Sequence, residues 1–360
     1  MKILIVGQGL AGTTLGYRLE RAGHRVHYTD APGQTAASAV AAGIVNPITG
    51  RHFVKSWRIE ELLPAARALY GELEDTLGLK LWYDQPLLRT LYNRGDVNSW
   101  EARAGDPGYA DYLEDDPDPG RLPELTAPVF AYAGVRHAAR VDVAGLVTAY
   151  RKKLEEEGRI TYEEFDYRTI PTLLGADAGA GQGPGRGAAR YDRVVCCTGW
   201  RARHSPWFSY LPHGGNKGEV LIVRTTAPAL DRMFKHRVFL VPLTEDTYWV
   251  GATSDNRFTD DGATETNRSF LADRLSEILT GTAYEIIAHR AAVRPTVRDR
   301  RMLLGEHPAL AGLFIFNGLG TKGASLAPLG SRWLTDHMLN GAALPAEVDI
   351  ARYAGLRAQT

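Results

Sequence analysis

The first thirty residues, MKILIVGQGLAGTTLGYRLERAGHRVHYTD, restrict the fold of this chain more than any other stretch. Lys2–Val6 is a short apolar run, as in strands that are buried on both faces of a parallel sheet. It leads into G-Q-G-L-A-G, after which leucines and alanines recur at helical spacing as far as Gly23. Residues 25–29 predict a second strand, which Asp30 ends. This order of elements predicts a Rossmann-like unit.

The residue types in this motif suit a dinucleotide. Gly7 allows a tight turn after the strand, Gly9 lets the backbone approach a pyrophosphate, and Gly12 lets the helix pack closely on the sheet. The helix N-terminus then offers free N–H groups to the phosphates. Asp30 can accept hydrogen bonds from ribose hydroxyls, and an acid there disfavours a 2′-phosphate. The alternative is a β-turn-α unit that binds no ligand. If a dinucleotide does bind, these residues do not distinguish NAD from FAD.

Composition and charge narrow the class of protein. With 360 residues, the chain is long enough for two domains or for one large domain. Lys+Arg and Asp+Glu both number 42, and this neutral balance gives no reason to expect a nucleic-acid partner or an anionic membrane surface. The two cysteines, Cys196 and Cys197, are adjacent, so we expect no disulfide framework and a reducing compartment. Without a signal-peptide pattern or an apolar run near the roughly 20 residues of a membrane span, a cytoplasmic location is expected.

Hydrophobic patterns predict helices and strands along the rest of the chain. Helices are predicted over residues 59–77, 141–157, 269–279 and 326–339. Strands are predicted over residues 82–91, 160–165, 193–197, 220–224, 238–242, 248–252 and 313–317. Residues 104–128 are rich in Asp, Pro and Gly and predict a loop. The low-complexity residues 175–190 predict a flexible hairpin tip.

Several motifs recur along nearly the whole chain in a fixed order. They are YDRVVCCTGW, the KGE of NKGEVLIV, VGATSDNRF, AVRPTVRDRRMLLGEHP and FNGLGTKGASLAP. Together with the N-terminal glycine motif, they resemble the flavin-dependent amine oxidase superfamily of D-amino-acid oxidase, glycine oxidase and sarcosine oxidase. GLGTKGASLAP is also similar to the glycine loop in the oxidase domain of the bifunctional tRNA methylaminomethyl-uridine modification enzyme.

The resemblance implies an α/β fold that is in part α+β. An interrupted Rossmann-like domain, residues 1–80, 138–205 and 296–360, would bind FAD without a covalent link. A second domain, residues 81–137 and 206–295, would be built on a mostly antiparallel sheet. The substrate would lie between that sheet and the isoalloxazine.

The resemblance also assigns residues to the cofactor. Ser38, Ala42 and Gly43 match the stretch that passes the phosphates and the flavin. Lys322 matches the C-terminal loop, where a helix N-terminus or a lysine can stabilise negative charge on reduced flavin. The full set is Gly7, Gly9, Gly12, Asp30, Ser38, Ala42, Gly43, Tyr167, Thr198, Gly199, Gly318, Gly320, Lys322 and Gly323.

On the substrate side, Arg294 in AVRPTVRD matches the arginine that clamps the substrate carboxylate in the family. A guanidinium suits this role because its planar fork binds a carboxylate through two hydrogen bonds. The alternative for Arg294 is a surface ion pair with Asp299 or another acid. Further candidates are Phe239, Trp249, His236, Arg51 and His52.

The function that this resemblance implies is FAD-dependent oxidation of a small amine or amino acid. The α-carbon would give a hydride to flavin N5, the imine would hydrolyse, and oxygen or a carrier would accept the electrons. A 2-hydroxy-acid dehydrogenase on the same fold is an alternative that needs a base, such as a histidine. Two further alternatives are an NAD-dependent reductase and a protein that binds flavin but catalyses no reaction. The ten histidines show no metal-binding spacing such as H-E-x-x-H, so no metal is predicted.

Overall fold

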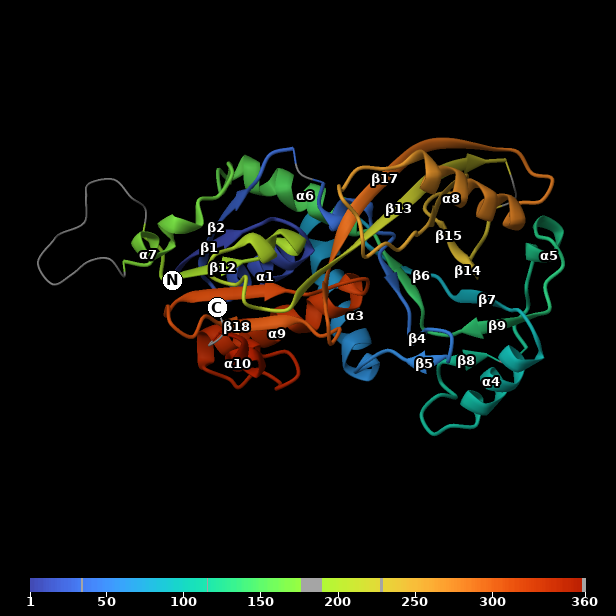
Figure 1. Ribbon diagram of the computed structural model, residues 1–360, viewed down its shortest axis with the longest axis horizontal. Helices are drawn as coiled ribbons and strands as arrows, with labels where there is room; N and C mark the ends of the chain where they lie inside the picture. Colours follow the sequence, from blue (N-terminus) through green and yellow to red (C-terminus); the bar gives the residue numbers. More distant parts are fainter. Residues whose placement is uncertain (34, 115, 176–189, 227–228, 358–360) are drawn as a thin grey trace, which may run out of the picture.

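Two large sheets carry most of the fold, one towards each end of the molecule (Figure 1). The computed structural model describes residues 1–33, 35–114, 116–175, 190–226 and 229–357. The N-terminus and residues 350–353 lie beside the sheet that contains the first strand (Figure 1). The predicted fold class, α/β with a mostly antiparallel second sheet, is confirmed by the topology of these two sheets.

The first sheet has six strands in the order β11-β2-β1-β12-β19-β18. They are β1 (Lys2–Val6), β2 (Arg25–Asp30), β11 (Ile160–Tyr162), β12 (Arg193–Cys196), β18 (Leu303–Glu306) and β19 (Leu313–Asn317). All neighbours run parallel except β18, which is antiparallel to β19. Because β1 pairs with β2 on one side and with β12 on the other, the strand order changes direction at the carboxyl end of β1. Open α/β sheets bind their ligands at such a point.

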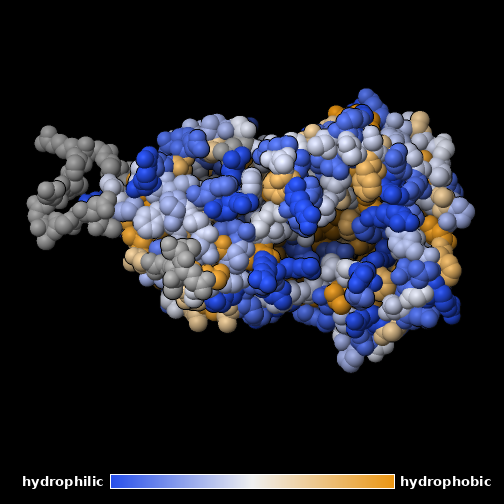
Figure 2. All heavy atoms as spheres, in the orientation of Figure 1, coloured by the Kyte–Doolittle hydropathy of each residue, from blue (hydrophilic) through white to orange (hydrophobic). Residues whose placement is uncertain are grey.

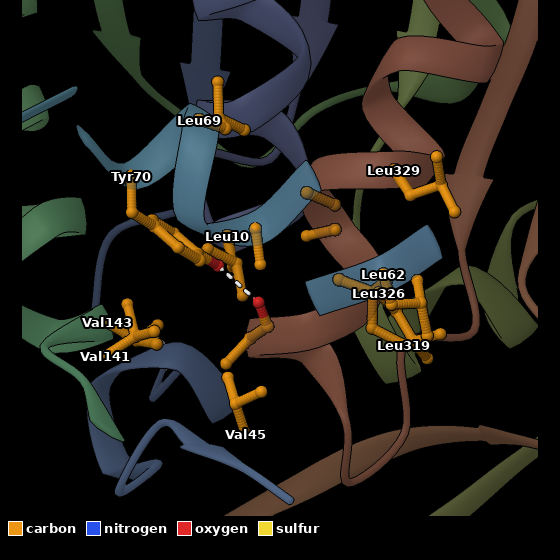
Figure 3. Packing of buried hydrophobic residues seen from close by; sticks show 14 of the residues in the cluster. Leu10, Val45, Leu62, Leu69, Tyr70, Val141, Val143, Leu319, Leu326 and Leu329 are labelled. Carbon is orange, nitrogen blue, oxygen red and sulfur yellow. Dashed lines mark hydrogen bonds between the residues drawn. The ribbon is translucent and has the colours of Figure 1, made fainter. Parts of the chain in front are cut away.

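Three helices build the core next to this sheet. α1 (Leu10–Arg21) packs on α9 (Gly323–Asn340), which packs on α3 (Ile59–Leu77). Figure 3 shows this core, where the Tyr70 hydroxyl of α3 donates to the Ala324 carbonyl oxygen of α9 at 2.8 Å. Leu10 and Leu319 lie in the same cluster (Figure 3). The first turns of α1 and α9 are therefore held in place by buried packing.

The second sheet has eight strands in the order β17-β13-β16-β15-β14-β7-β9-β8. They are β7 (Leu87–Leu91), β8 (Leu113–Glu114), β9 (Ala131–Val135), β13 (His213–Thr225), β14 (Met233–His236), β15 (Val238–Pro242), β16 (Thr247–Gly251) and β17 (Tyr284–Val297). All neighbours are antiparallel except β14 and β7, which are parallel. Figure 1 shows the long strands β13 and β17 running from this sheet into the middle of the molecule.

The remaining elements are short or cover the sheets. The helices are α2 (Ala37–Val40), α4 (Arg94–Ala104), α5 (Leu122–Leu125), α6 (Val143–Glu156), α7 (Ile170–Leu173), α8 (Glu265–Ile278), α10 (Ala354–Arg357) and the 3-10 helices η1 (Tyr167–Thr169), η2 (Gly199–His204) and η3 (Ile350–Tyr353). β3 (Ile44–Val45), β10 (Ala139–Val141) and β6 (Trp82–Asp84) form a three-stranded sheet, and β4 (Ile48–Thr49) pairs with β5 (Val54–Lys55). No helix among the described residues has the length and apolar character needed to cross a bilayer.

The predicted single strand over residues 82–91 is wrong. The structure has β6 and β7 there, in two different sheets, with Gln85 and Pro86 between them. A proline lacks the N–H that a central strand needs, which explains the break. The hydrophobic pattern alone does not reveal the break, because apolar residues occur on both sides of it.

Other predictions were incomplete. Residues 104–128 contain β8 and α5 as well as loop, and the strand at 160 ends at Tyr162. β17 was not predicted at all, although it pairs with β13 along nearly its whole length. β13 begins at His213, because pairing with β17 holds its glycine-rich first half extended. Residues 176–189, most of the predicted hairpin tip, lie outside the described residues.

The predicted division into two domains can be compared with the sheets. Strands of the six-stranded sheet come from residues 1–80, 138–205 and 296–360. Strands of the eight-stranded sheet come from residues 81–137 and 206–297. Whether these parts behave as separate domains remains a prediction.

Candidate functional site

A cavity of about 740 Å³ is lined by residues from both large sheets. One part of its wall comes from the β1–α1 turn, residues 35–44, the end of β12 and the start of α9. The other part comes from β13, β14, β15, β16 and β17. Figure 2 shows a hollow with hydrophobic side chains on one face of the molecule, near β4 and β6 of Figure 1, which contribute no residue to the lining of this cavity. The cavity is within the size range of sites for small molecules and cofactors.

The β1–α1 turn forms one end of the cavity. The turn is tight: a Cβ on Gly12 would lie 2.1 Å from the carbonyl oxygen of Gly7, so only glycine lets α1 come this close. Gly9 precedes α1 without any side-chain cap, and Gly7 and Gly9 both line the cavity. The Leu10 N–H donates to the Ser38 hydroxyl at 3.0 Å. The other N–H groups of this first turn have no acceptor within the helix. They lie at the helix N-terminus, which is the positive end of the helix dipole.

Beyond this turn, the cavity wall is acidic. Asp30, Glu163 and Glu164 line it. The Asp30 carboxylate is held by Arg151, 2.5 Å away, and accepts a hydrogen bond from the Gln8 N–H at 3.3 Å. A carboxylate fixed in this way keeps lone pairs for ribose hydroxyls. Arg151 also donates to the Gln8 side chain at 2.7 Å, and the sequence analysis did not single it out.

Tyr167, Thr198 and Gly199 also line the cavity. Burial raises the pKa of Tyr167 to about 12, so its phenol stays neutral at physiological pH. Ala42, Gly43, Gly320 and Gly323 lie in the lining as well. These residues come from four separate stretches of sequence, which the fold brings to one wall.

The residues at this end fit a dinucleotide. The hydroxyl of Thr29, at the end of β2, is buried in the lining without a hydrogen-bond partner among the described residues. Buried hydroxyls are normally paired, so a bound molecule is the expected partner. Together with the open first turn of α1 and the fixed Asp30 carboxylate, this site would hold the pyrophosphate and ribose of FAD.

Arg294 lies on β17, where the eight-stranded sheet faces the cavity. Its guanidinium donates to the Asn216 side-chain oxygen at 2.5 Å and to the Thr253 carbonyl oxygen at 3.3 Å. Among the described residues, no carboxylate lies within ion-pair distance of it. Burial lowers the pKa of Arg294, but a guanidinium stays charged in proteins. The site therefore presents a fixed positive charge without a protein counter-ion.

Gly218, across from β17, makes room for this guanidinium. A Cβ built on Gly218 would lie 2.0 to 2.3 Å from three atoms of the Arg294 guanidinium. The alternative ion pair of Arg294 with Asp299 does not occur, because Asp299 accepts from Arg352 at 3.1 Å and from the Tyr353 hydroxyl at 2.7 Å.

The floor between the sheet and the cofactor end is apolar. Val220, Phe239 and Trp249 lie on neighbouring strands and line the cavity. The indole Nε1–H of Trp249 donates to the Val40 carbonyl oxygen at 2.8 Å, which fixes the ring. The structure thus places Phe239 and Trp249 in the same cavity as Arg294.

Other predicted site residues lie outside the lining. His236 follows Lys235 on β14, so its side chain points to the opposite face of the strand, where its Nδ1 lies 3.1 Å from the Thr90 hydroxyl. The Lys322 ammonium donates to the hydroxyls of Ser56 at 3.1 Å and Thr49 at 3.3 Å. Gly12 and Gly318 serve close packing, and Arg51 and His52 are exposed in the β4–β5 turn.

The sequence analysis missed Asn216, Gly218, Lys235 and Arg151 as site residues. Asn216 directly precedes the quoted KGE motif, but its contact with Arg294 depends on the pairing of β13 with the unpredicted strand β17. Lys235 and His236 are adjacent in the sequence. Only a correct prediction of strand β14, with its alternating side-chain directions, could have shown which of the two faces the cavity.

Comparisons with known proteins agree with this geometry. The family model for FAD-dependent oxidoreductases matches residues 2–337. A glycine oxidase from Geobacillus kaustophilus is 25% identical over 353 residues, which cover 93% of this chain and 92% of that protein. The bifunctional protein MnmC of tRNA 5-methylaminomethyl-2-thiouridine biosynthesis, from a Caulobacter species, is 26% identical and covers 96% of this chain and 55% of that protein.

The fold is also found among solved structures. The crystal structure of glycine oxidase from Geobacillus kaustophilus matches with a TM-score of 0.77 at 20% identity, covering 98% of this chain and 97% of that one. This match extends over both large sheets, and the family model covers most of the chain. The chain therefore belongs to the family of FAD-dependent oxidoreductases.

Proposed function

We propose that this FAD-dependent oxidoreductase oxidises a small amine or amino acid that carries a carboxylate. The observation that carries the proposal is Arg294, a half-buried cation in the cavity wall, with no carboxylate among the described residues within ion-pair distance. Burying an unpaired charge is costly, so such a group is expected to meet a negative ligand. The relatives named as glycine oxidases support an amino acid as that ligand.

Each group in the site would have a defined task. Bound FAD supplies a two-electron acceptor. Arg294 would hold the substrate carboxylate through its fork, while Asn216 and the Thr253 carbonyl fix the guanidinium. Phe239 and Trp249 would exclude water and position the carbon that is oxidised.

The strands around Arg294 bring no carboxylate or imidazole into the cavity, and the histidine of the described lining, His204, comes from η2 instead; this distribution favours an amine over a 2-hydroxy acid. The described lining residues that come from β13 to β17 include no histidine, aspartate or glutamate. A neutral amine can be oxidised without a protein base, whereas a hydroxy acid must lose its hydroxyl proton to one. We therefore place the 2-hydroxy-acid dehydrogenase second.

The first test is the absorbance spectrum of the purified protein, followed by anaerobic addition of amines. The panel contains glycine, sarcosine and both enantiomers of proline and alanine, with lactate and glycolate as hydroxy-acid controls. We expect a flavin spectrum that an amine bleaches and that the hydroxy acids leave unchanged. Bleaching by hydroxy acids alone would overturn the proposal. Re-oxidation by oxygen or by a dye then identifies the kind of acceptor.

The second test replaces Arg294, the residue that would bind the substrate carboxylate. Arg294→Met should lower kcat/KM for carboxylate-bearing amines by at least about 30-fold, since losing a charge-assisted contact of this kind typically costs about 2–5 kcal/mol. FAD content should stay the same. Arg290→Met is the matched control, because Arg290 lies on the same strand and is exposed. Equal kinetics in the two variants would remove Arg294 from the site.

We further propose oxygen or an electron carrier as the acceptor, the cytoplasm as the compartment, and two domains with the boundaries given above. Support for a reducing compartment comes from Cys196 and Cys197, which are both free and buried. Burial raises the pKa of both thiols, so neither is a reactive thiolate at neutral pH. Cell fractionation with an antibody tests the compartment.

A further inference from the structure

A second cation without a protein counter-ion lies in the same cavity wall. Lys235 on β14 lines the cavity, and its ammonium lies 4.3 Å from the centroid of the Phe239 ring. It donates to the backbone carbonyl oxygen of Arg237 at 2.6 Å. Among the described residues, no carboxylate comes within ion-pair distance of it. The nearest fixed partners of this ammonium are thus a carbonyl and a ring face.

A third cation stands directly beside it. β14 and β7 are parallel neighbours, and their register pairs Lys235 with Arg89, so both side chains lie on the same face of the sheet. The Arg89 guanidinium carbon lies 4.4 Å from the centroid of the Phe53 ring, and its Nε is buried without a hydrogen-bond partner. The nearby Asp96 carboxylate instead accepts from the Tyr92 N–H at 2.9 Å.

Two like charges opposite one another on neighbouring strands destabilise a sheet. Burial and the positive charge of Arg89 lower the pKa of Lys235 to about 8, which shows that the folded protein disfavours this charge. At neutral pH the ammonium is nevertheless mostly protonated. A bound anion would relieve both the burial and the repulsion.

The acids of the cavity lie at one end. The described acids of the lining, Asp30, Glu163 and Glu164, are beyond the β1–α1 turn, where Arg151 and Arg201 also line the cavity. The cations Arg294 and Lys235 are on the eight-stranded sheet, with Val220, Phe239 and Trp249 between them. The substrate part of the cavity therefore has a positive group on each side of an apolar floor.

The spacing of the two cations sets the size of a ligand that could contact both. The Arg294 guanidinium lies over Gly218 on β13, and the Lys235 ammonium lies by Phe239 on β15, two strands away. With strands about 4.8 Å apart, and Gly218 two residues away from the position level with Phe239, the two positions are on the order of 12 Å from one another. Two charge-assisted hydrogen bonds of about 2.8 Å take up part of this distance. A chain of a few methylene groups fits in the rest.

We propose that the substrate carries two acidic groups. Its first carboxylate binds Arg294, and a second acidic group at the far end of a short chain binds Lys235, with Arg89 adding positive potential behind it. This inference rests on the proposed function, because it names the class of amine that the same site takes. On this inference, Lys235 determines the specificity of the site for acidic over neutral amino acids.

A binding experiment on the FAD-loaded protein tests the site without turnover. The probes are the dicarboxylates from malonate to suberate, and the monocarboxylates of the same chain lengths, titrated against the change in flavin absorbance. We expect one short dicarboxylate to bind at least about 10-fold more tightly than its monocarboxylate. Equal affinities for the two series in the unmodified protein would overturn the inference, whether or not any variant folds.

Variants then assign the preference to one side chain. Lys235→Met keeps the aliphatic stem and should abolish the preference for dicarboxylates, because dicarboxylate binding should weaken far more than monocarboxylate binding. Lys235→Arg should retain the preference. Arg237→Met is the matched control, because Arg237 is a neighbouring cation that does not line the cavity. A preference that survives in Lys235→Met would contradict the role of Lys235.

Anaerobic flavin reduction separates this inference from the proposed function. Glutamate is compared with glutamine, and aspartate with asparagine, in both enantiomers. If neutral amines bleach the flavin as fast as the acidic ones, the second anion site is wrong and amine oxidation stands. If no amine bleaches it but dicarboxylates still bind selectively, amine oxidation is wrong and the anion site stands.

Discussion

Gly218 decides where the Arg294 guanidinium can lie, because any β-carbon there would occupy its space. Gly218→Ala should push the guanidinium away from its Asn216 acceptor. We expect KM for carboxylate-bearing amines to rise about 10-fold or more, the size of a weakened charge-assisted hydrogen bond, with FAD affinity unchanged. Steady-state kinetics and FAD titration measure both. Gly71→Ala on α3 is the control, since a Cβ there meets nothing within 4 Å; equal KM values in the two variants would contradict this account.

Single residues also show how far the sequence could predict the site. Arg294 was predicted because the motif around it resembles a family pattern, and the structure places it in the cavity wall. His236 was selected for its chemistry, but strand alternation turns it away and turns Lys235 inward. Lys322 was placed near the flavin, which stays a prediction: its ammonium donates to the hydroxyls of Ser56 and Thr49, and its neighbours Thr321 and Gly323 line the cavity. Side-chain direction depends on strand register, which composition and motifs do not encode.

At the level of elements, the two faces of β13 have different tasks. One face contributes residues to the cavity, and the other face contacts α8, which holds the strand in place. Asn216 and Gly218 face the cavity, whereas the fully buried Glu219 carboxylate faces α8. There it accepts from the Thr264 N–H and the Asn267 amide, both at 2.8 Å. Burial acts to raise the pKa of Glu219, but these hydrogen bonds outweigh it and lower the pKa below its usual value.

Glu219→Gln should therefore destabilise the protein by about 2 kcal/mol, because the buried network loses its negative charge and one of its two acceptor oxygens. Since the folded-state pKa of Glu219 is lowered, its contribution is present above the unfolded pKa of about 4.3 and is lost as pH falls through the folded value. Urea unfolding at pH 7 and pH 4 measures the gap between the two proteins, which should narrow at pH 4. Glu285→Gln on β17, at an exposed position, should change little; a constant gap would contradict the linkage.

Elements with strong periodicity were predictable, and those that depend on partners were not. The N-terminal strand, glycine turn and α1 follow from local pattern alone. β17 contains arginines and a proline, and only pairing with β13 makes it a strand. α8 begins four residues before its predicted start, because the Thr264 hydroxyl accepts from the Asn267 N–H and so caps the helix.

Over the whole molecule, the cavity joins the two large sheets, so a molecule that fills it should stabilise both together. Removing FAD should lower the melting temperature. Adding FAD back at 1,000 times its Kd should restore about 4 kcal/mol. Thermal unfolding with and without FAD measures this, with FMN as the control, because it lacks the adenosine that the Asp30 end would hold. A melting temperature that is indifferent to FAD would contradict the assignment of this cavity.

The hydrogen bond from Trp249 to the Val40 carbonyl has a consequence for protein engineering. Trp249 belongs to the apolar floor of the cavity, whereas Val40 ends α2, in the stretch that lines the end where we expect the cofactor. Smaller residues at position 249 would enlarge the pocket but would also remove this hydrogen bond. Variants with a wider substrate range at this position are therefore expected to bind the cofactor less well. Phe239 has no such bond, and position 239 is where the substrate range can be broadened independently.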